Sequence, residues 1–425
     1  MRDLLIMAML FPPMLYGFRH PWVGLLVWVV ISILNPHRFA WGFTYSIPFA
    51  YMAFISIFLG LLFSKDEKNF SLNAHLVLLL LFLGWMSLSS TFAFYPAESW
   101  SMFIRVFKIY LMVMAASVLI INAQQVRALT WILFLSIGLL SAKGGVFTLL
   151  TGGNYRVWGP PESMVEDNNA FALASIMVIP LCMFLSDELK NRWAKYVLWS
   201  MAVLCLFSAL GSHSRGGFVA ISAMGAFLWF KSKYKIRLML VFLLLVPTAL
   251  AFMPEEWFDR MGTIETYEED ESAMGRINAW QTSFNVANSR ITGSGFDFAN
   301  PLVFNLHAPD PTVPRVAHSI YFQVLGEQGW PGLFLFLIFW WMTWRACTWI
   351  IRTCKPYGDM EWMSNLSRMI QVSILAYFTG GAFLNLAYFE LPYYEAMIVL
   401  AMSRLLKKRQ DESKKKLERK AATIA

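Results

Sequence analysis

This chain is a succession of apolar runs, and no other feature constrains its fold as strongly. Charged residues make up only 15% of the sequence, whereas soluble domains carry about 25%. The mean hydropathy is +0.51. A transmembrane helix needs about 20 apolar residues, and several of these runs are shorter, so we predict an all-α polytopic membrane protein with about 12 transmembrane helices. The runs cover residues 4–17, 21–34, 47–63, 74–90, 103–121, 129–150, 170–185, 195–211, 216–230, 236–253, 331–351, 369–386 and 391–405.

One polar stretch, residues 254–317, interrupts this succession. Irregular backbone is tolerated at membrane depth only where protein or water surrounds it, so we expect this stretch to lie outside the bilayer core. The predicted organisation follows from that break. It comprises a transmembrane bundle over 1–253, one long helical loop over 254–330, further transmembrane helices over 331–406 and a basic tail over 407–425.

Lysine and arginine in the short loops predict how the chain is oriented. Basic clusters at 65–68, 190–195, 231–237 and 407–420 fall on one side of the membrane if the runs alternate. That side is predicted to be the cytoplasm, and the long loop then faces outward. Strict alternation also places Met1 outside, unless a short N-terminal run is re-entrant.

Cysteine and net charge exclude two classes of function. The four cysteines, at positions 182, 205, 347 and 354, lie in or beside apolar runs or on the inner side, so no disulfide framework is indicated. The net charge of +8 is concentrated in the C-terminal tail. We interpret that tail as a solvated anchor beside anionic membrane lipid, and we predict no nucleic-acid partner.

Arginine recurs in the outward loops. Arg38 and Arg156 lie in two of them, and Arg215 begins an apolar run. An arginine at a membrane boundary is costly unless it is paired, which makes Arg215 a candidate for function. Gly216 and Gly217 would let a bulky ligand approach the backbone and would leave helix N-terminal amides free for an anion. The alternative is a boundary arginine followed by a glycine pair that starts a helix.

The long loop supplies two more candidates. Arg276 could hold a phosphate through a bidentate contact, or form a salt bridge with the acidic run 268–271. His318 precedes Ser319 and Tyr321, and its imidazole could take a proton from a hydroxyl near neutral pH. Glu327 lies too far along the chain to be a one-turn partner of His318, but it could pair with an arginine or cap a loop.

The outward loops offer no pattern typical of a metal site. They contain no Asp-X-Asp triplet, and the acids at 268–271 are too clustered for spaced ligands. Guanidinium groups in a low-dielectric cleft could instead stabilise the negative charge of a pyrophosphate leaving group. We therefore predict that neither a metal nor a cofactor is required.

Taken together, these motifs resemble the O-antigen ligase and polymerase family of membrane glycosyltransferases. The resemblance spans roughly residues 154–386, and the first hundred residues look like the exosortase-associated subgroup of O-glycosylation ligases. The matching motifs are Ser214-Arg215-Gly216-Gly217, Gly275-Arg276 with Trp280, Gly293-Ser294-Gly295, and His318-Ser319 with Tyr321, Gly326-Glu327-Gln328-Gly329 and Gly332.

The resemblance implies a GT-C type fold in the bacterial inner membrane, with the reaction on the periplasmic side. The donor would be a glycan on undecaprenyl pyrophosphate and the acceptor lipid A–core, joined in one inverting displacement. Arg215 and Arg276 would contact the donor pyrophosphate, and His318 would serve the acceptor hydroxyl. Arg38 and Arg156 are further candidate pyrophosphate ligands without a clear counterpart in the wider family. The predicted supporting residues are Gly216, Gly217, Ser319, Tyr321 and Glu327.

Three alternative functions remain open from the sequence. A polymerase of the same family would use a growing glycan as both donor and acceptor. An O-oligosaccharyltransferase would use protein Ser or Thr, and usually carries a larger outward C-terminal domain. A lipid-linked glycan flippase would line a central cavity with charge on both sides of the membrane, and would not need a histidine beside an arginine loop.

Overall fold

The structure is a computed structural model of the 425-residue chain. It describes residues 1–231 and 271–424, together with the single positions 236, 243, 247, 253, 255 and 258. The predicted apolar run 236–253, the acidic positions 268–270 and most of the first part of the long loop lie outside the described residues. Within the described residues every regular element is a helix.

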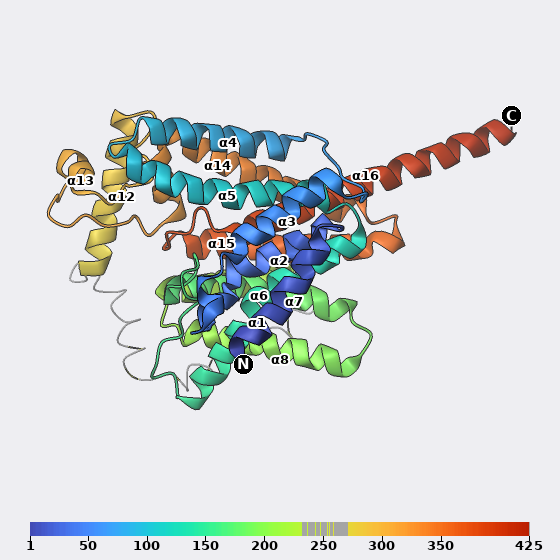
Figure 1. The fold of residues 1–425 in the computed structure, drawn as a ribbon, viewed down its shortest axis with the longest axis horizontal. Coiled ribbons are helices and arrows are strands. Elements are labelled where there is room, and N and C mark those ends of the chain that lie inside the picture. Colours follow the sequence, from blue (N-terminus) through green and yellow to red (C-terminus); the bar gives the residue numbers. More distant parts are fainter. Residues whose placement is uncertain are drawn as a thin grey trace.

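The helices coincide closely with the predicted apolar runs (Figure 1). The first part of the chain forms α1 (Arg2–Gly17), α2 (Pro21–Leu34), the 3-10 helices η1 (Pro36–Phe39) and η2 (Phe43–Ser46), α3 (Phe49–Phe63), α4 (Ala74–Thr91), α5 (Pro96–Leu119), α6 (Ala123–Leu150), α7 (Asn168–Glu188), α8 (Arg192–Leu210) and α9 (Arg215–Lys231). The second part forms α12 (Glu271–Ser289), α13 (Pro301–His307), α14 (Ile320–Thr353), η3 (Gly358–Met360), α15 (Glu361–Gly381) and α16 (Glu390–Ile424). The predicted boundary at 330 falls inside α14, because that helix begins at Ile320 rather than at the apolar run.

Six of the described helices are long and apolar enough to cross a membrane, namely α4, α5, α6, α7, α8 and α14. The shorter apolar helices are α2, α3 and the segment Arg215–Phe230 of α9. These helices identify a multi-pass membrane protein. The count of about 12 spans and the GT-C type remain predictions.

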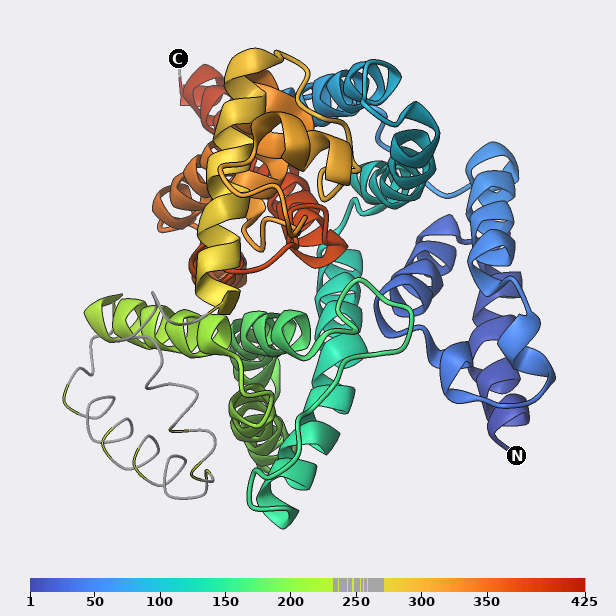
Figure 2. The same ribbon diagram turned by 90° about the vertical axis from the view of Figure 1, so that its left-hand side faces the viewer.

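The loops gather at two ends of the helix bundle. The end that holds the loops before α9 and α14 is called here the motif end, and the opposite end the tail end. Hydrogen bonds between separate loops define the motif end: Asp3 to Thr44 at 2.7 Å, Asn35 to Pro161 at 3.1 Å, Val157 to Gly211 at 3.1 Å and Phe94 to Ser294 at 3.2 Å. Met1 lies at this end, as strict alternation predicts, and Figure 2 views the molecule from this side.

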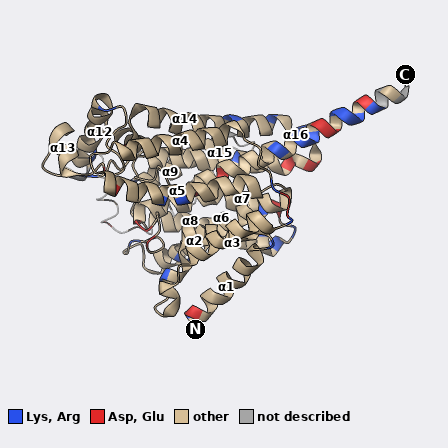
Figure 3. Ribbon diagram, turned by 45° about the horizontal axis from the view of Figure 1, so that its top comes forward, with Lys and Arg blue, Asp and Glu red and all other residues tan. Residues whose placement is uncertain are grey.

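Ion pairs define the tail end. They join His20 to Asp66 at 3.0 Å, Arg127 to Glu188 at 2.7 Å and Arg409 to Asp359 at 3.3 Å. The C-terminal part of α16 extends away from this end as a helix that carries both basic and acidic residues (Figure 3). The lysines of the described loops, at positions 65, 68, 190 and 355, lie at the tail end together with the basic C-terminal part of α16, which agrees with the predicted distribution of charge.

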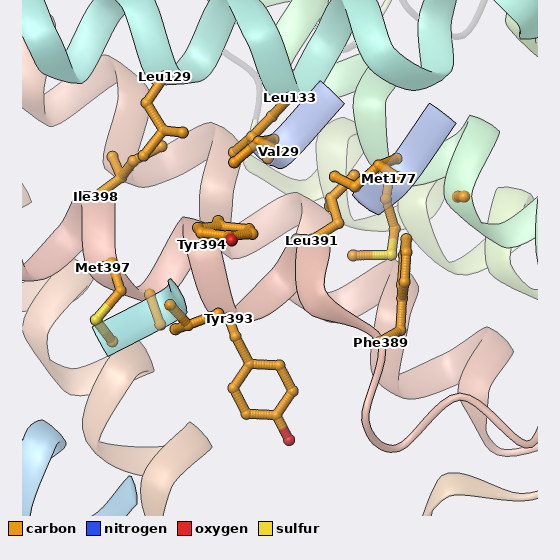
Figure 4. Packing of buried hydrophobic residues seen from close by; sticks show 14 of the residues in the cluster. Val29, Leu129, Leu133, Met177, Phe389, Leu391, Tyr393, Tyr394, Met397 and Ile398 are labelled. Atoms are coloured by element: carbon orange, nitrogen blue, oxygen red, sulfur yellow. The ribbon is translucent and has the colours of Figure 1, made fainter. Parts of the chain in front are cut away.

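The core is built around the first half of α16, which is buried on all sides. Tyr394 and Met397 are fully buried, and in Figure 4 Leu129 of α6 lies beside Ile398 while Leu133 lies beside Val29. Val29 of α2 and Met177 of α7 belong to the same cluster. A helical segment that is buried on every face is covered by other helices, so the first half of α16 is the central element of the bundle.

A break in α14 fixes the loop after α12 to the bundle. Pro331 lies inside the helix and lacks an amide hydrogen, and the backbone of Gly329 leaves the helical region with φ 65° and ψ −173°. The carbonyls freed by this break accept other donors. The amides of Ser294 and Gly295 bond to Gly326 and Glu327 at 2.9 and 3.0 Å, and the Trp85 indole bonds to Gln328 at 2.7 Å.

We predict that Gly329→Ala destabilises the protein. A Cβ at Gly329 would lie 2.2 Å from the Ile291 carbonyl oxygen, and the left-handed backbone is strained for any residue with a side chain. The strain alone costs about 1–3 kcal/mol, so the Tm in detergent should fall by several degrees. Gly84→Ala is the matched control, because nothing lies within 4 Å of its Cβ position in α4. Equal Tm values for the two variants would contradict the role assigned to this break.

Candidate functional site

His318 lies at the motif end, in the loop that leads into α14. The Trp280 indole of α12 donates to the carbonyl of Ala317 at 2.7 Å, and its ring stacks on Phe322 with centroids 5.1 Å apart. The backbone of His318 has φ 44°, in the left-handed region that residues with side chains seldom adopt. Such strain persists only where neighbouring contacts impose it, and α12 supplies those contacts.

Charged groups from three segments surround the half-buried imidazole. Burial lowers the pKa of His318 below its ordinary value, the positive charges of Arg276 and Arg315 lower it further, and Asp167 opposes them. At neutral pH the imidazole is therefore held in its neutral form. A neutral imidazole can accept a proton, which is what a general base must do.

Arg315 packs directly against Gly275, the residue that immediately precedes the functional candidate Arg276. A Cβ at Gly275 would lie 2.8 Å from Nη1 of Arg315 and 2.9 Å from its Cδ. Glycine at 275 thus makes room for a second guanidinium close to His318. The sequence analysis did not single out Arg315, although its position three residues before His318 in a polar loop was an available signal.

Asp167 approaches His318 from the start of α7. Its carboxylate caps that helix, accepting from the amides of Asn169 and Ala170 at 2.9 and 3.3 Å. The neighbouring Asn168 is buried and donates to the Ser212 carbonyl at 2.6 Å. The start of α7 is thereby fixed to the turn that precedes Arg215, so Asp167 links the two motifs. Asp167, Asn168 and Asn169 are adjacent in the sequence, which by itself does not reveal this connection.

The turn before α9 positions Arg215. His213 has φ 55°, and its Nε2 lies 2.7 Å from the Gly153 carbonyl oxygen. Ser214 accepts from the amide of Gly217 at 3.0 Å through its hydroxyl. The expectation that the glycine pair leaves amides free for an anion is therefore wrong at Gly217, because the serine side chain already caps this amide.

The glycine pair also permits close helix packing. A Cβ at Gly216 would lie 3.3 Å from the Phe383 Cβ, and one at Gly217 would lie 3.1 Å from the Ala172 Cβ of α7. The turn that carries Arg215 is therefore packed closely between α7 and the end of α15. Small residues allow this approach, which fixes the position of the arginine backbone.

Arg156 and Arg38 occupy different surroundings. Arg156 is exposed in the loop between α6 and α7, and the amide of the next residue, Val157, bonds to the Gly211 carbonyl beside the Arg215 turn. Arg38 forms an ion pair with Glu162 at 3.0 Å and lies over the Tyr45 ring at 4.5 Å. The carboxylate of Glu162 already balances the charge of Arg38.

The predicted supporting residues of α14 hold this helix in place. Ser319 is buried at the N-terminus of α14, and the Tyr321 hydroxyl donates to the Phe378 carbonyl of α15 at 3.1 Å. Glu327 is buried and accepts from the Tyr388 hydroxyl at 2.6 Å. A tyrosine partner for Glu327 was not foreseen, because Tyr388 lies in a segment that carries no motif.

The fold and this site define a class of protein, a multi-pass helical membrane protein with a histidine and arginines gathered at one end of the bundle. Comparison with known families agrees with this class. Residues 200–337 match the family model described as O-antigen ligase, and residues 1–190 match a family of unknown function. The match over residues 200–337 supports an O-antigen ligase-like family, as the motifs predicted. The match supports a glycan ligase or polymerase type of function. No curated protein matches the chain.

We predict opposite pH shifts for two charge-removing variants. Activity that needs a neutral His318 is lost as the pH falls through its pKa. Arg315→Gln removes a positive neighbour, raises that pKa and moves the acid limb of the pH–rate profile to higher pH. Asp167→Asn removes the opposing negative charge and moves the limb to lower pH, while asparagine still caps α7.

Asp310→Asn is the matched control, because the exposed carboxylate of Asp310 bonds only within its own loop, to Thr312. Its pH–rate profile should coincide with that of the unmodified protein. Shifts of the same sign in Arg315→Gln and Asp167→Asn would disprove this account of the charges.

Proposed function

We propose that this protein is an O-antigen ligase that transfers a glycan from undecaprenyl pyrophosphate to lipid A–core. The reaction would take place at the motif end, which we assign to the periplasmic side of the bacterial inner membrane. The loop lysines and the basic part of α16 at the tail end support this orientation, because cytoplasmic segments carry the excess of basic residues. We assign the bundle to the GT-C type.

The observation that carries the proposal is the position of the His318 imidazole beside the guanidinium groups of Arg276 and Arg315, which lowers the pKa of this histidine. A histidine that only packed at a boundary would not require a left-handed backbone held by α12. In the proposed reaction His318 accepts the proton of the acceptor hydroxyl. The hydroxyl oxygen then attacks the anomeric carbon, the bond to the pyrophosphate oxygen breaks, and the configuration at that carbon is inverted.

Arg276 and Arg215 would take the negative charge of the departing pyrophosphate. Both guanidiniums are partly buried, where electrostatic stabilisation of a leaving group is stronger than in water. Arg315 adds charge at the same place, and the exposed Arg156 could reach a larger ligand. Among the described residues no three His, Cys, Asp or Glu side chains gather as metal ligands would. Metal independence accordingly stays a prediction, to be checked by activity in EDTA.

We predict that His318→Ala abolishes glycan transfer while leaving membrane insertion and Tm unchanged. Loss of a general base costs about 10²–10⁴-fold in rate. The measurement is transfer from purified lipid-linked glycan by purified protein. His307→Ala is the matched control, since His307 lies in the same loop region at the end of α13. Near-normal transfer by a folded His318→Ala protein would remove this residue from the mechanism.

Arg215→Lys and Arg276→Lys should each lower kcat/KM by about tenfold or more, although the charge is kept. A compact ammonium cannot reproduce the bidentate contact of a guanidinium with a phosphate. Arg352→Lys, near the end of α14 at the tail end, serves as the control. Wild-type activity in both motif variants would show that these arginines do not hold the pyrophosphate.

The acceptor is tested by deleting the gene. We expect lipopolysaccharide that stops at the core while lipid-linked glycan accumulates, because the donor would still be made but not consumed. A plasmid copy should restore full-length lipopolysaccharide, and a plasmid copy with His318→Ala should not. Unchanged lipopolysaccharide with glycan missing from an exported protein would favour an O-oligosaccharyltransferase. Shortened glycan chains still attached to the core would favour a polymerase.

A further inference from the structure

A second polar site lies away from His318, in a cavity between α2, α5 and the start of α16. Its volume is about 400 Å³. The residues that matter chemically are Ser32 of α2, Arg105 and Lys108 of α5, Glu390 of α16 and Glu162 of the loop between α6 and α7. None of the arginines predicted from the sequence lines this cavity, so it is separate from the pyrophosphate site proposed above.

The two cations of this cavity lie in the middle of a membrane-spanning helix. Lys108 is twelve residues after Pro96, the first residue of α5, and therefore about 18 Å from that end of the helix. Arg105 lies one turn earlier on the same face, and both side chains are exposed. Lysine and arginine side chains can extend to the membrane–water interface only when they lie near the end of a transmembrane helix. In the middle of a span they therefore mark a functional site.

No hydrogen bond or ion pair joins either cation to a described residue, although Arg105 acts electrostatically on Glu390. A positive charge at this depth requires an anion nearby. The pair, spaced one turn apart, suits a group with several acceptor oxygens, as a phosphate has. Water that fills the cavity could solvate both charges but would not select for any ligand.

Glu390 contributes a buried carboxylate to the same cavity. Its side chain is 1% exposed, and one carboxylate oxygen accepts from the Ser32 hydroxyl at 2.7 Å. The other oxygen, Oε2, is buried and has no hydrogen-bond partner among the described residues. A buried acceptor without a donor is costly, and a ligand hydroxyl in the cavity would satisfy it.

We propose that this cavity binds the head group of a lipid that carries both a phosphate and hydroxyl groups. Arg105 and Lys108 hold the phosphate, and Glu390 accepts from a hydroxyl. The exposed face of α5 admits the lipid sideways from the bilayer.

We assign this lipid to the acceptor, a step that rests on the function proposed above. Glu162 lines the cavity and lies in the same loop as Asp167, the carboxylate beside His318. The loop joins the two sites at the motif end, so an acceptor held in the cavity would extend its glycan toward the imidazole.

Binding can be tested without any transfer reaction. Purified full-length protein in detergent would be titrated with phosphatidylglycerol, which has a phosphate and hydroxyls, and with phosphatidylcholine, which has a phosphate but no free hydroxyl and no net charge. We expect phosphatidylglycerol to bind more tightly. Arg105→Gln and Lys108→Gln should each weaken its binding by about tenfold, and Glu390→Gln should reduce the preference over phosphatidylcholine.

Lys143→Gln is the matched control, because Lys143 is an exposed cation within α6 that does not line the cavity. Its binding of phosphatidylglycerol should be unchanged. Unaltered binding in the Arg105 and Lys108 variants, with unchanged Tm, would overturn the site. Displacement of the lipid by an equal concentration of inorganic phosphate would overturn the lipid part of the proposal.

A kinetic measurement tests the acceptor assignment separately. In Arg105→Gln and Lys108→Gln the KM for lipid A–core should rise about tenfold, while the KM for the lipid-linked glycan stays constant. An unchanged KM for lipid A–core would overturn the assignment even if phosphatidylglycerol binds as expected. Selective lipid binding by a protein that transfers nothing to lipid A–core would refute the proposed function and leave the lipid site standing.

Discussion

The requirement that backbone carbonyls find donors inside a membrane protein governs the arrangement at the motif end. Pro331 and Gly329 interrupt α14, and an interrupted helix leaves carbonyls that hydrocarbon cannot satisfy. Other groups donate hydrogen bonds to these carbonyls. They are the amides of Ser294 and Gly295, the indole of Trp85 and the hydroxyl of Ser89. One helix break thereby fastens the loop after α12 to α4 and α14. That fastening adds to the direct contacts by which α12 holds the residues around His318.

The electrostatics of the site follow from this scaffold. Arg276 is carried by α12, Arg315 by the loop before α14 and Asp167 by the cap of α7. Two positive charges and partial burial outweigh one negative charge, so the pKa of His318 falls. The same guanidiniums that suit a pyrophosphate thus keep the neighbouring imidazole able to accept a proton. Donor binding and base catalysis are then two consequences of one charge arrangement.

The sequence could predict the elements of this fold better than their contacts. Apolar runs located α2 and α4 almost to the residue, because both helices are defined by hydropathy. The apolar runs did not locate the start of α14, because the turns before Pro331 carry the polar residues Gln323 and Glu327. Both side chains are buried, and their hydrogen-bond partners lie far away in the chain. Hydropathy alone cannot predict that Glu327 is buried. Its burial depends on a hydrogen bond from Tyr388, which lies in the segment between α15 and α16.

The candidate site shows the same limit. His318, Arg215 and Arg276 were identified from residue type and spacing. Arg315 and Asp167 were not, because their importance depends on a glycine at 275 and on the cap of α7. The sequence left two readings of the glycine pair after Arg215, and its close packing against α7 and the end of α15 becomes visible only in the structure.

The position of Arg105 and Lys108 adds a further constraint on how a bundle like this one can work. The sequence analysis passed over them because each lies within a run that is otherwise apolar, where hydropathy averages hide single charges. A cation retained in such a run carries a desolvation cost wherever no anion is bound. Water in the cavity can offset part of that cost, and an anionic head group would offset more of it. In the proposed site such a head group is abundant in the membrane or delivered to this face of α5, and an acceptor lipid awaiting transfer meets that condition.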